Sequence, residues 1–168
     1  MTTLHSIGYG NRDLQTFIGL LHRHHIRYLA DVRTSPYSKQ FEYYRQSQLE
    51  GHLKNAGIKY VYMGKELGGK PEDPMLRTFD GKINYEAVRM SEPFREGLSR
   101  LRVAHDKDVR LVMMCAELRP EHCHRARLIG EALFEQQINV QHVDADGEAR
   151  PHAQIRERWN QNNELSLF

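Results

Sequence analysis

A short apolar run that ends in a cysteine and a carboxylate constrains the fold of this chain most. The run Leu111–Cys115 is followed by Glu117, by a polar loop with one proline, and then by Cys123–Arg125 at the start of an amphipathic segment. An apolar run of this length is typical of a buried strand. Reactive side chains at the carboxyl end of a strand, facing a helix start, indicate the ligand crevice of an open α/β sheet.

The rest of the chain repeats this alternation of strand and helix. Strands are predicted at residues 3–7, 28–32, 59–63, 110–115 and 139–143. Helices are predicted at 14–25, 41–56, 85–105, 126–134 and 153–160, and residues 64–84 form the longest irregular segment. Such alternation predicts a compact, Rossmann-like three-layer α/β domain whose mainly parallel sheet has about five strands. A loop as long as 64–84 is usually functional or mobile.

Composition limits the class of protein. The 168 residues are 39% hydrophobic and 27% charged, which fits one globular domain at 1–160 and a flexible tail at 161–168. The formal net charge of +2 neither requires nor excludes nucleic acid as a partner. The sequence shows no signal peptide and no apolar stretch of membrane-spanning length, so a cytoplasmic protein with two free thiols is expected.

Each of the first four predicted strands is followed by a loop of unusual composition. Because the carboxyl ends of parallel strands share one edge of the sheet, these loops are expected to converge there. The first loop holds Gly8 and Gly10. The candidate site residues of the other three loops are Asp31, Arg33, Ser38, Gly68, Gly69, Lys70, Cys115, Glu117, Cys123, His124 and Arg125.

Two arginines suggest an anion site. The planar fork of Arg33 or Arg125 fits phosphate or carboxylate, and Arg125 lies in the first turn of its helix, where free backbone amides favour an anion. On this interpretation Arg125→Ala abolishes ligand binding and leaves the fold intact. The alternative is that Asp31 pairs with one arginine as a structural bridge. Gly68–Lys70 adds only a weak phosphate signal, because it lacks the G-x-x-x-x-G-K-[ST] pattern.

The cysteines allow three interpretations. A thiol beside a helix N-terminus, with histidine and arginine nearby, has a lowered pKa and acts as a nucleophile; His124 and Glu117 would then be acid and base. Alternatively Cys115, Cys123, His124 and Glu117 hold zinc or iron, although their spacing matches no standard zinc motif. Third, both cysteines are buried and structural. We predict no metal ligand and leave the cofactor open.

The chain resembles, over nearly its whole length, the bacterial family called domain of unknown function 488. The residues that carry the resemblance are Ile7–Gly10, Asp31–Arg33 with Pro36 and Ser38, Leu67–Lys70, Tyr85–Met90, Cys115–Glu117 and Cys123–Arg125. Tyr9 and Gly10 stand where the family usually has His and Ser, and Lys70 replaces Arg, which keeps the charge but loses the fork. The resemblance implies a compact α/β fold and a shared polar site. It implies no reaction.

The C-terminus suggests a partner. Leu165, Leu167 and Phe168 are large apolar residues of the kind that anchor a peptide in a partner's pocket. The ending looks like the bacterial sliding-clamp-binding peptide, with Glu164 in place of the usual glutamine. The alternative is that these side chains fold back onto the domain.

The combined expectation is a protein that acts on or binds nucleic acid or a nucleotide, in DNA maintenance, through an anion site at the carboxyl edge of the sheet. A non-catalytic module that binds a small anion or modified base is the first alternative. A thiol- or metal-dependent enzyme acting on a small molecule is the second.

Overall fold

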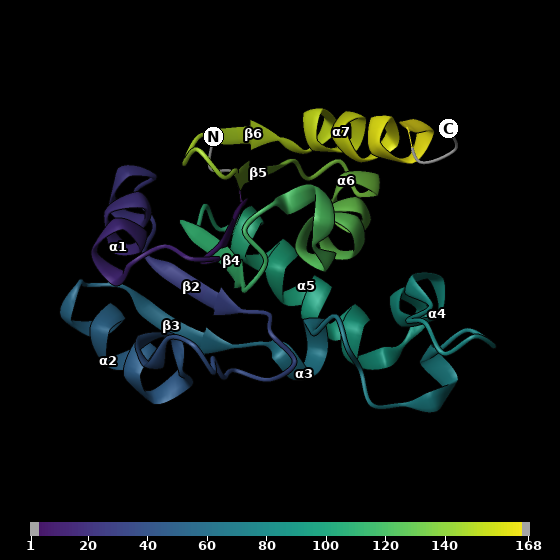
Figure 1. The fold of residues 1–168 in the computed structure, drawn as a ribbon, viewed down its shortest axis with the longest axis horizontal. Coiled ribbons are helices and arrows are strands. Elements are labelled where there is room, and N and C mark those ends of the chain that lie inside the picture. The colour runs from purple at the N-terminus through teal and green to yellow at the C-terminus, as the bar shows by residue number, and fades with distance from the viewer. Residues whose placement is uncertain (1–3, 166–168) are drawn as a thin grey trace.

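The computed structural model describes residues 4–165, which form a sheet covered by helices on both faces (Figure 1). Within this range the sheet has six strands in the order β3-β2-β4-β1-β5-β6, and every neighbouring pair except β5–β6 is parallel. The strands are β1 (Leu4–Gly8), β2 (Tyr28–Asp31), β3 (Lys59–Tyr62), β4 (Leu111–Cys115), β5 (Val140–Val143) and β6 (Ala149–Pro151). The predicted fold class is confirmed. The antiparallel strand β6, only three residues long, was not predicted.

The helices follow the predicted alternation with three differences. Ser91 has extended backbone angles (φ −69°, ψ 147°), so the predicted helix at 85–105 is two helices. The irregular segment contains a short helix, and the last helix continues to Leu165. The helices are α1 (Leu14–Arg23), α2 (Gln46–Asn55), α3 (Gly64–Leu67), α4 (Tyr85–Met90), α5 (Glu92–Asp106), α6 (Glu131–Glu135) and α7 (His152–Leu165), with 3₁₀ turns at Glu42–Tyr44, Pro74–Leu76 and Pro120–His122 and a π-helical segment at Arg125–Gly130. None of the helices in residues 4–165 has the length and apolar character needed to cross a bilayer.

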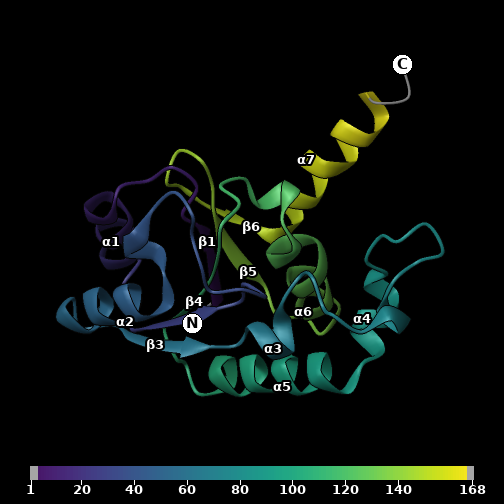
Figure 2. The same cartoon turned by 60° about the horizontal axis from the view of Figure 1, so that its bottom comes forward.

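The core has two parts, one on each face of the sheet, because successive strand residues point to opposite faces. Leu29 belongs to the part formed with α1 and α2, whereas its neighbour Ala30 belongs to the part formed with α5 and α6. Figure 2 shows α1 and α2 on one side and α5 on the other. On α5, Phe94, Leu98 and Leu101 are buried against the sheet.

Local sequence signals mark the ends of two helices. The carboxylate of Asp13 caps α1 by accepting a 2.8 Å hydrogen bond from the backbone of Thr16. Gly57 follows α2 with φ +77°, a left-handed conformation that glycine adopts without strain. These caps begin and end the helices that return the chain to the sheet.

Strands β1 and β4 are neighbours in the sheet, and after them the chain turns towards opposite faces. A ligand crevice is expected between two such strands. In this protein, backbone hydrogen bonds between the loops that follow β1 and β4 close that crevice. The amide of Tyr9 donates to the Cys115 carbonyl at 3.1 Å, and the amide of Gly10 donates to the Ala116 carbonyl at 3.0 Å. A Cβ on Gly8 would lie 1.7 Å from the Glu117 carbonyl oxygen, so glycine is required for this approach. The open space therefore lies on the other side of β4, towards β2.

Candidate functional site

A cleft of about 650 Å³ lies at the carboxyl ends of β2 and β4. Its size fits a small-molecule site. Its walls come from three of the four loops that were expected to converge. The lining residues are Arg33, Thr34, Ser35, Tyr37, Gly69, Lys70, Tyr85, Cys115, Ala116, Glu117, His122, Cys123 and His124.

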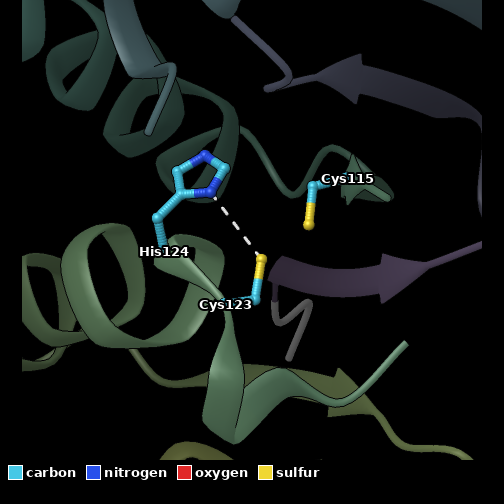
Figure 3. A group of neighbouring side chains, drawn as sticks. All are labelled: Cys115, Cys123 and His124. Atoms are coloured by element: carbon cyan, nitrogen blue, oxygen red, sulfur yellow. Dashed lines mark hydrogen bonds between the residues drawn. The ribbon is translucent and has the colours of Figure 1, made fainter. Parts of the chain in front are cut away.

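The two cysteines and His124 meet at this cleft (Figure 3). Both cysteines are reduced, and their two Sγ atoms and one ring nitrogen of His124 all lie within 4.8 Å of one another. The Sγ of Cys123 is 3.7 Å from Nδ1 of His124. Cys115 ends β4, and the 3₁₀ turn Pro120–His122 brings Cys123 back beside it. The predicted approach of the two cysteines is thus present.

Cys123 occupies the start of a helical segment. Its backbone is extended (φ −122°, ψ 146°), whereas His124 is helical (φ −61°, ψ −23°). The thiol sulfur accepts the backbone N–H of Arg125 at 3.5 Å, in the way that a capping side chain does. The partial positive charge of a helix N-terminus favours a thiolate there. The segment continues as the π-helical turn Arg125–Gly130, a type of turn frequent at functional sites.

The ring of His124 has a defined tautomer when it is neutral. Its Nε2 lies 3.0 Å from the carbonyl oxygen of Val32. A carbonyl only accepts, so Nε2 carries a hydrogen. In the neutral ring Nδ1 then holds a free lone pair and faces the thiol of Cys123. The two side chains can therefore exchange a proton.

Arg125 points into the protein and away from the cleft. It is fully buried. Its Nη1 donates to the Cys115 sulfur at 3.5 Å and to the Glu117 carbonyl at 2.6 Å, its Nη2 donates to the Leu118 carbonyl at 3.2 Å, and its Nε donates to the Ser6 hydroxyl at 3.1 Å. The guanidinium is the positive charge beside the thiol pair. We therefore expect Arg125→Ala to destabilise the fold, in contrast to the expectation from the sequence, because the truncation would leave these buried acceptors without their donor.

The surroundings of the two thiols shift their pKa values in opposite directions. Burial opposes ionisation of Cys123, but the interaction with the Cys115 thiol and the charges of Arg125 and His124 outweigh it and hold the pKa of Cys123 well below its ordinary value. The interaction with Cys123, together with burial, raises the pKa of Cys115 well above its ordinary value. The two thiols therefore titrate as a coupled pair, in which the surroundings favour Cys123 as the thiolate.

Asp31 and Arg33 form the structural bridge that the sequence offered as the alternative to an anion site. Nε and Nη2 of Arg33 donate to the two carboxylate oxygens at 2.9 and 2.7 Å, and the hydroxyl of Tyr60 donates to the same carboxylate at 2.7 Å. Asp31 is fully buried and does not line the cleft. Arg33 is 6% exposed and forms part of its wall.

Three other predicted residues have local backbone roles. The hydroxyl of Ser38 accepts the amide of Phe41 at 3.1 Å in a turn outside the cleft. A Cβ on Gly68 would lie 2.4 Å from the Gly64 carbonyl oxygen, and a Cβ on Gly69 would lie 2.7 Å from the Cγ of His124. Both glycines thus permit close contacts, and Gly69 makes its contact at the thiol cluster.

Lys70 and Glu117 are the exposed charges of the predicted set, and both line the cleft. Glu117 accepts the amide of Arg119 at 3.1 Å. Tyr85, Tyr37 and His122 are lining residues that the search for reactive groups missed. Only Tyr85 had a signal, since it opens the Tyr85–Met90 segment of the family resemblance.

The cluster also has donor types that bind zinc, namely two sulfurs and an imidazole nitrogen. Zinc binding would require both thiols as thiolates and a free lone pair on Nδ1 of His124, whereas a nucleophilic cysteine requires only one thiolate.

Residues 13–132 match the family described as Domain of unknown function DUF488. The match spans well over half of the chain, so the protein belongs to this family, and the resemblance noted in the sequence is confirmed. Comparisons with curated proteins and with solved structures gave no significant match. Since the family description names no reaction, function must be argued from the site.

Proposed function

We propose that the protein is a thiol-dependent enzyme in which the Cys123 thiolate attacks an electrophilic centre of a small molecule bound in the cleft. One observation carries this proposal: the Cys123 sulfur lies among a second thiol, a histidine nitrogen and a buried guanidinium, and it lines the open cleft. A thiolate, rather than a thiol, is the nucleophilic form of cysteine.

The proton balance of such a reaction follows from the same geometry. Nδ1 of His124 accepts the proton of Cys123, which leaves a thiolate and an imidazolium. The thiolate forms a bond to the substrate, the bond to the leaving group breaks with its electron pair, and the imidazolium protonates that group. Attack by water or a second acceptor on the covalent intermediate, with His124 taking the acceptor's proton, releases Cys123 as thiolate. Cys115 keeps its proton throughout.

Alkylation tests this proposal without knowledge of the substrate. Iodoacetamide is added to the reduced protein between pH 5 and 9, and mass spectrometry of peptides follows each cysteine. We expect Cys123 to react with an apparent pKa well below the ordinary thiol value of about 8.5, and Cys115→Ser to retain that reaction. An ordinary apparent pKa for Cys123, or preferential modification of Cys115, would contradict it. Cys123→Ser is the control for background.

The two free thiols also suggest the cellular compartment of the protein. Free thiol pairs persist in reducing surroundings, so we assign the protein to the cytoplasm.

Nucleic acid or a nucleotide is the second candidate ligand, with a role in DNA maintenance. The observation that favours it is the exposed Lys70 in the lining of the cleft. Binding of labelled single- and double-stranded DNA at two salt concentrations tests it. Binding that weakens steeply with salt and falls in Lys70→Ala would support it, because counterion release sets that slope. Binding without any product would favour a non-catalytic module.

The clamp-binding tail remains a prediction. Helix α7 projects from the body of the protein towards Leu165, the last residue that the structure describes (Figure 2). Leu167 and Phe168 lie outside the described residues. Measuring the affinity of the purified bacterial clamp for the full chain and for a Leu167→Ala, Phe168→Ala double variant tests this partner.

A further inference from the structure

A chain of hydrogen bonds connects Arg125 to a carboxylate at the surface. Nε of Arg125 donates to the hydroxyl of Ser6 at 3.1 Å, and that hydroxyl lies 2.6 Å from Nδ1 of His142. Nε2 of His142 lies 2.9 Å from Nδ1 of His152, whose Nε2 lies 3.0 Å from the Glu131 carboxylate. The proposed reaction uses none of the last four residues.

The chain crosses the domain from its interior to its edge. It starts on β1 at Ser6, passes β5 at His142 and α7 at His152, and ends at Glu131 on α6. The serine and both histidines are 0% exposed, whereas the side chain of Glu131 is 19% exposed and also pairs with Arg156 at 3.1 Å. Four polar groups from four elements therefore form one continuous buried network.

Every bond in the network has a single consistent direction. The Glu131 carboxylate accepts, so Nε2 of His152 carries a hydrogen. In neutral His152, Nδ1 then accepts from Nε2–H of His142, and Nδ1 of His142 accepts the hydroxyl hydrogen of Ser6. The lone pairs of Ser6 face Nε–H of Arg125. With both histidines neutral, each of these groups donates or accepts as its chemistry requires, and no donor faces another donor.

The histidines are held neutral by their surroundings. Burial, with smaller contributions from His152, Arg125 and His5, lowers the pKa of His142 well below its ordinary value. Burial also lowers the pKa of His152, against the opposing charge of Glu131. The other titratable groups that act on this region are His5 beside His142, Arg156 beside Glu131, Arg12 beside Arg125, and Tyr85 and His124 beside the thiols.

The backbone makes room for the network. The π-helical segment ends at Gly130, where a Cβ would lie 2.8 Å from both Cε1 and Nδ1 of the His152 ring. The ring is further held between Phe134 and Trp159, whose centroids lie 5.2 and 5.6 Å away. The same segment thus begins beside the thiol of Cys123 and ends against the middle of the network.

We infer that Ser6, His142, His152 and Glu131 are positioning residues that hold the Arg125 guanidinium beside the Cys115–Cys123 pair and so favour the Cys123 thiolate. The inference rests on the proposed function, since it concerns the same thiolate. Nε of Arg125 has Ser6 as its partner, and the rest of the network fixes the Ser6 hydroxyl in the orientation that accepts. Without this anchor the guanidinium keeps only its Nη contacts to the Cys115 sulfur and to the carbonyls of Glu117 and Leu118. Its place beside the sulfur is then less fixed, and the thiolate loses part of its counter-charge.

The experiment compares the pH profile of Cys123 alkylation by iodoacetamide in the full chain and in Ser6→Ala, with Ser38→Ala as the matched control. Both serines are buried, but the hydroxyl of Ser38 bonds only to a local amide. We expect Ser6→Ala to raise the apparent pKa of Cys123 and to slow its alkylation roughly three- to tenfold at pH values below the wild-type apparent pKa, since there each pKa unit changes the thiolate fraction about tenfold. Ser38→Ala should keep the wild-type profile, and Ser6→Thr, which retains the hydroxyl, should recover part of the rate.

The two proposals fail in different ways. An ordinary profile for Cys123 in the wild-type chain overturns the proposed function. A low apparent pKa that is equal in wild type and in folded Ser6→Ala overturns the inference alone. Should Ser6→Ala not fold, as judged by circular dichroism, Glu131→Ala at the partly exposed end removes the acceptor of His152 and gives the same readout. A raised apparent pKa supports the inference, and an unchanged one overturns it.

Discussion

Asp31 and Arg33 form a buried bidentate ion pair, with Nε–Oδ1 and Nη2–Oδ2 distances of 2.9 and 2.7 Å. Their side chains are 0% and 5% exposed. The pair fixes the backbone where the chain leaves β2 and enters the cleft wall. Asp31 was a candidate catalytic residue on the sequence alone, and its contacts favour a structural role.

Asp31→Asn is expected to lower the free energy of unfolding by about 3–5 kcal/mol, because it leaves the Arg33 guanidinium buried without a counter-charge. Tyr60→Phe removes only the hydroxyl that donates to Asp31 and should cost about 1 kcal/mol. Urea denaturation of both variants measures the difference. Equal and small losses would show that the pair contributes little to stability.

Much of the fold was predictable because the signals are local. The short strand segments that became β1 to β5, the cap at Asp13 and the glycine at 57 each depend on a few neighbouring residues. The break at Ser91 also has a local signal, because Pro93 favours the first turn of a helix that begins there. The strand β6 was harder, because tertiary contacts decide the conformation of so short a stretch.

The sequence indicated which residues form the candidate site, but not where their side chains point. The positions of Cys115 and Cys123 at a strand end and a helix start implied that they would meet. Whether Arg125 faces the cleft or the interior depends on Ser6, 119 residues away in sequence, and on the carbonyls of the loop after β4. No pattern along the chain contains that information.

Gly69→Ala is expected to disturb the cluster without changing a charged group. The added methyl would lie 2.7 Å from Cγ and 2.8 Å from Nδ1 of His124, so the ring must move away from Cys123. We expect alkylation of Cys123 at pH 6.5 to slow. Gly51→Ala is the control, since a Cβ there meets nothing within 4 Å; it should leave the rate unchanged and stabilise α2 by roughly 0.5–1 kcal/mol. Equal alkylation rates in the two variants would show that the position of His124 does not affect the reactivity of the Cys123 thiol.

Stability is expected to fall as the pH drops below about 6.5, the ordinary pKa of histidine. The folded state lowers the pKa of His142 and His152, so below that pH the unfolded chain binds more protons than the folded one. The loss has a slope of at most about 1.4 kcal/mol per pH unit for each histidine. Urea denaturation between pH 7.5 and 5 measures it, in a range above the titration of ordinary carboxyls. The exposed His22→Ala variant should show the same slope, and a flat profile in the wild type would contradict the prediction.

Arg125→Lys separates the charge of the side chain from its hydrogen bonds. Lysine keeps the positive charge but has no fork, so it cannot reach the Ser6 hydroxyl, the Cys115 sulfur and the carbonyls of Glu117 and Leu118 together. Because buried acceptors lose their donors, we expect the free energy of unfolding to fall by at least about 2 kcal/mol. Arg127→Lys, at an exposed position of the same segment, should change it by less than about 0.5 kcal/mol. If Arg125→Lys is as stable as the wild type and instead loses affinity for DNA, the guanidinium serves a ligand in the cleft, and the inward assignment of Arg125 is wrong.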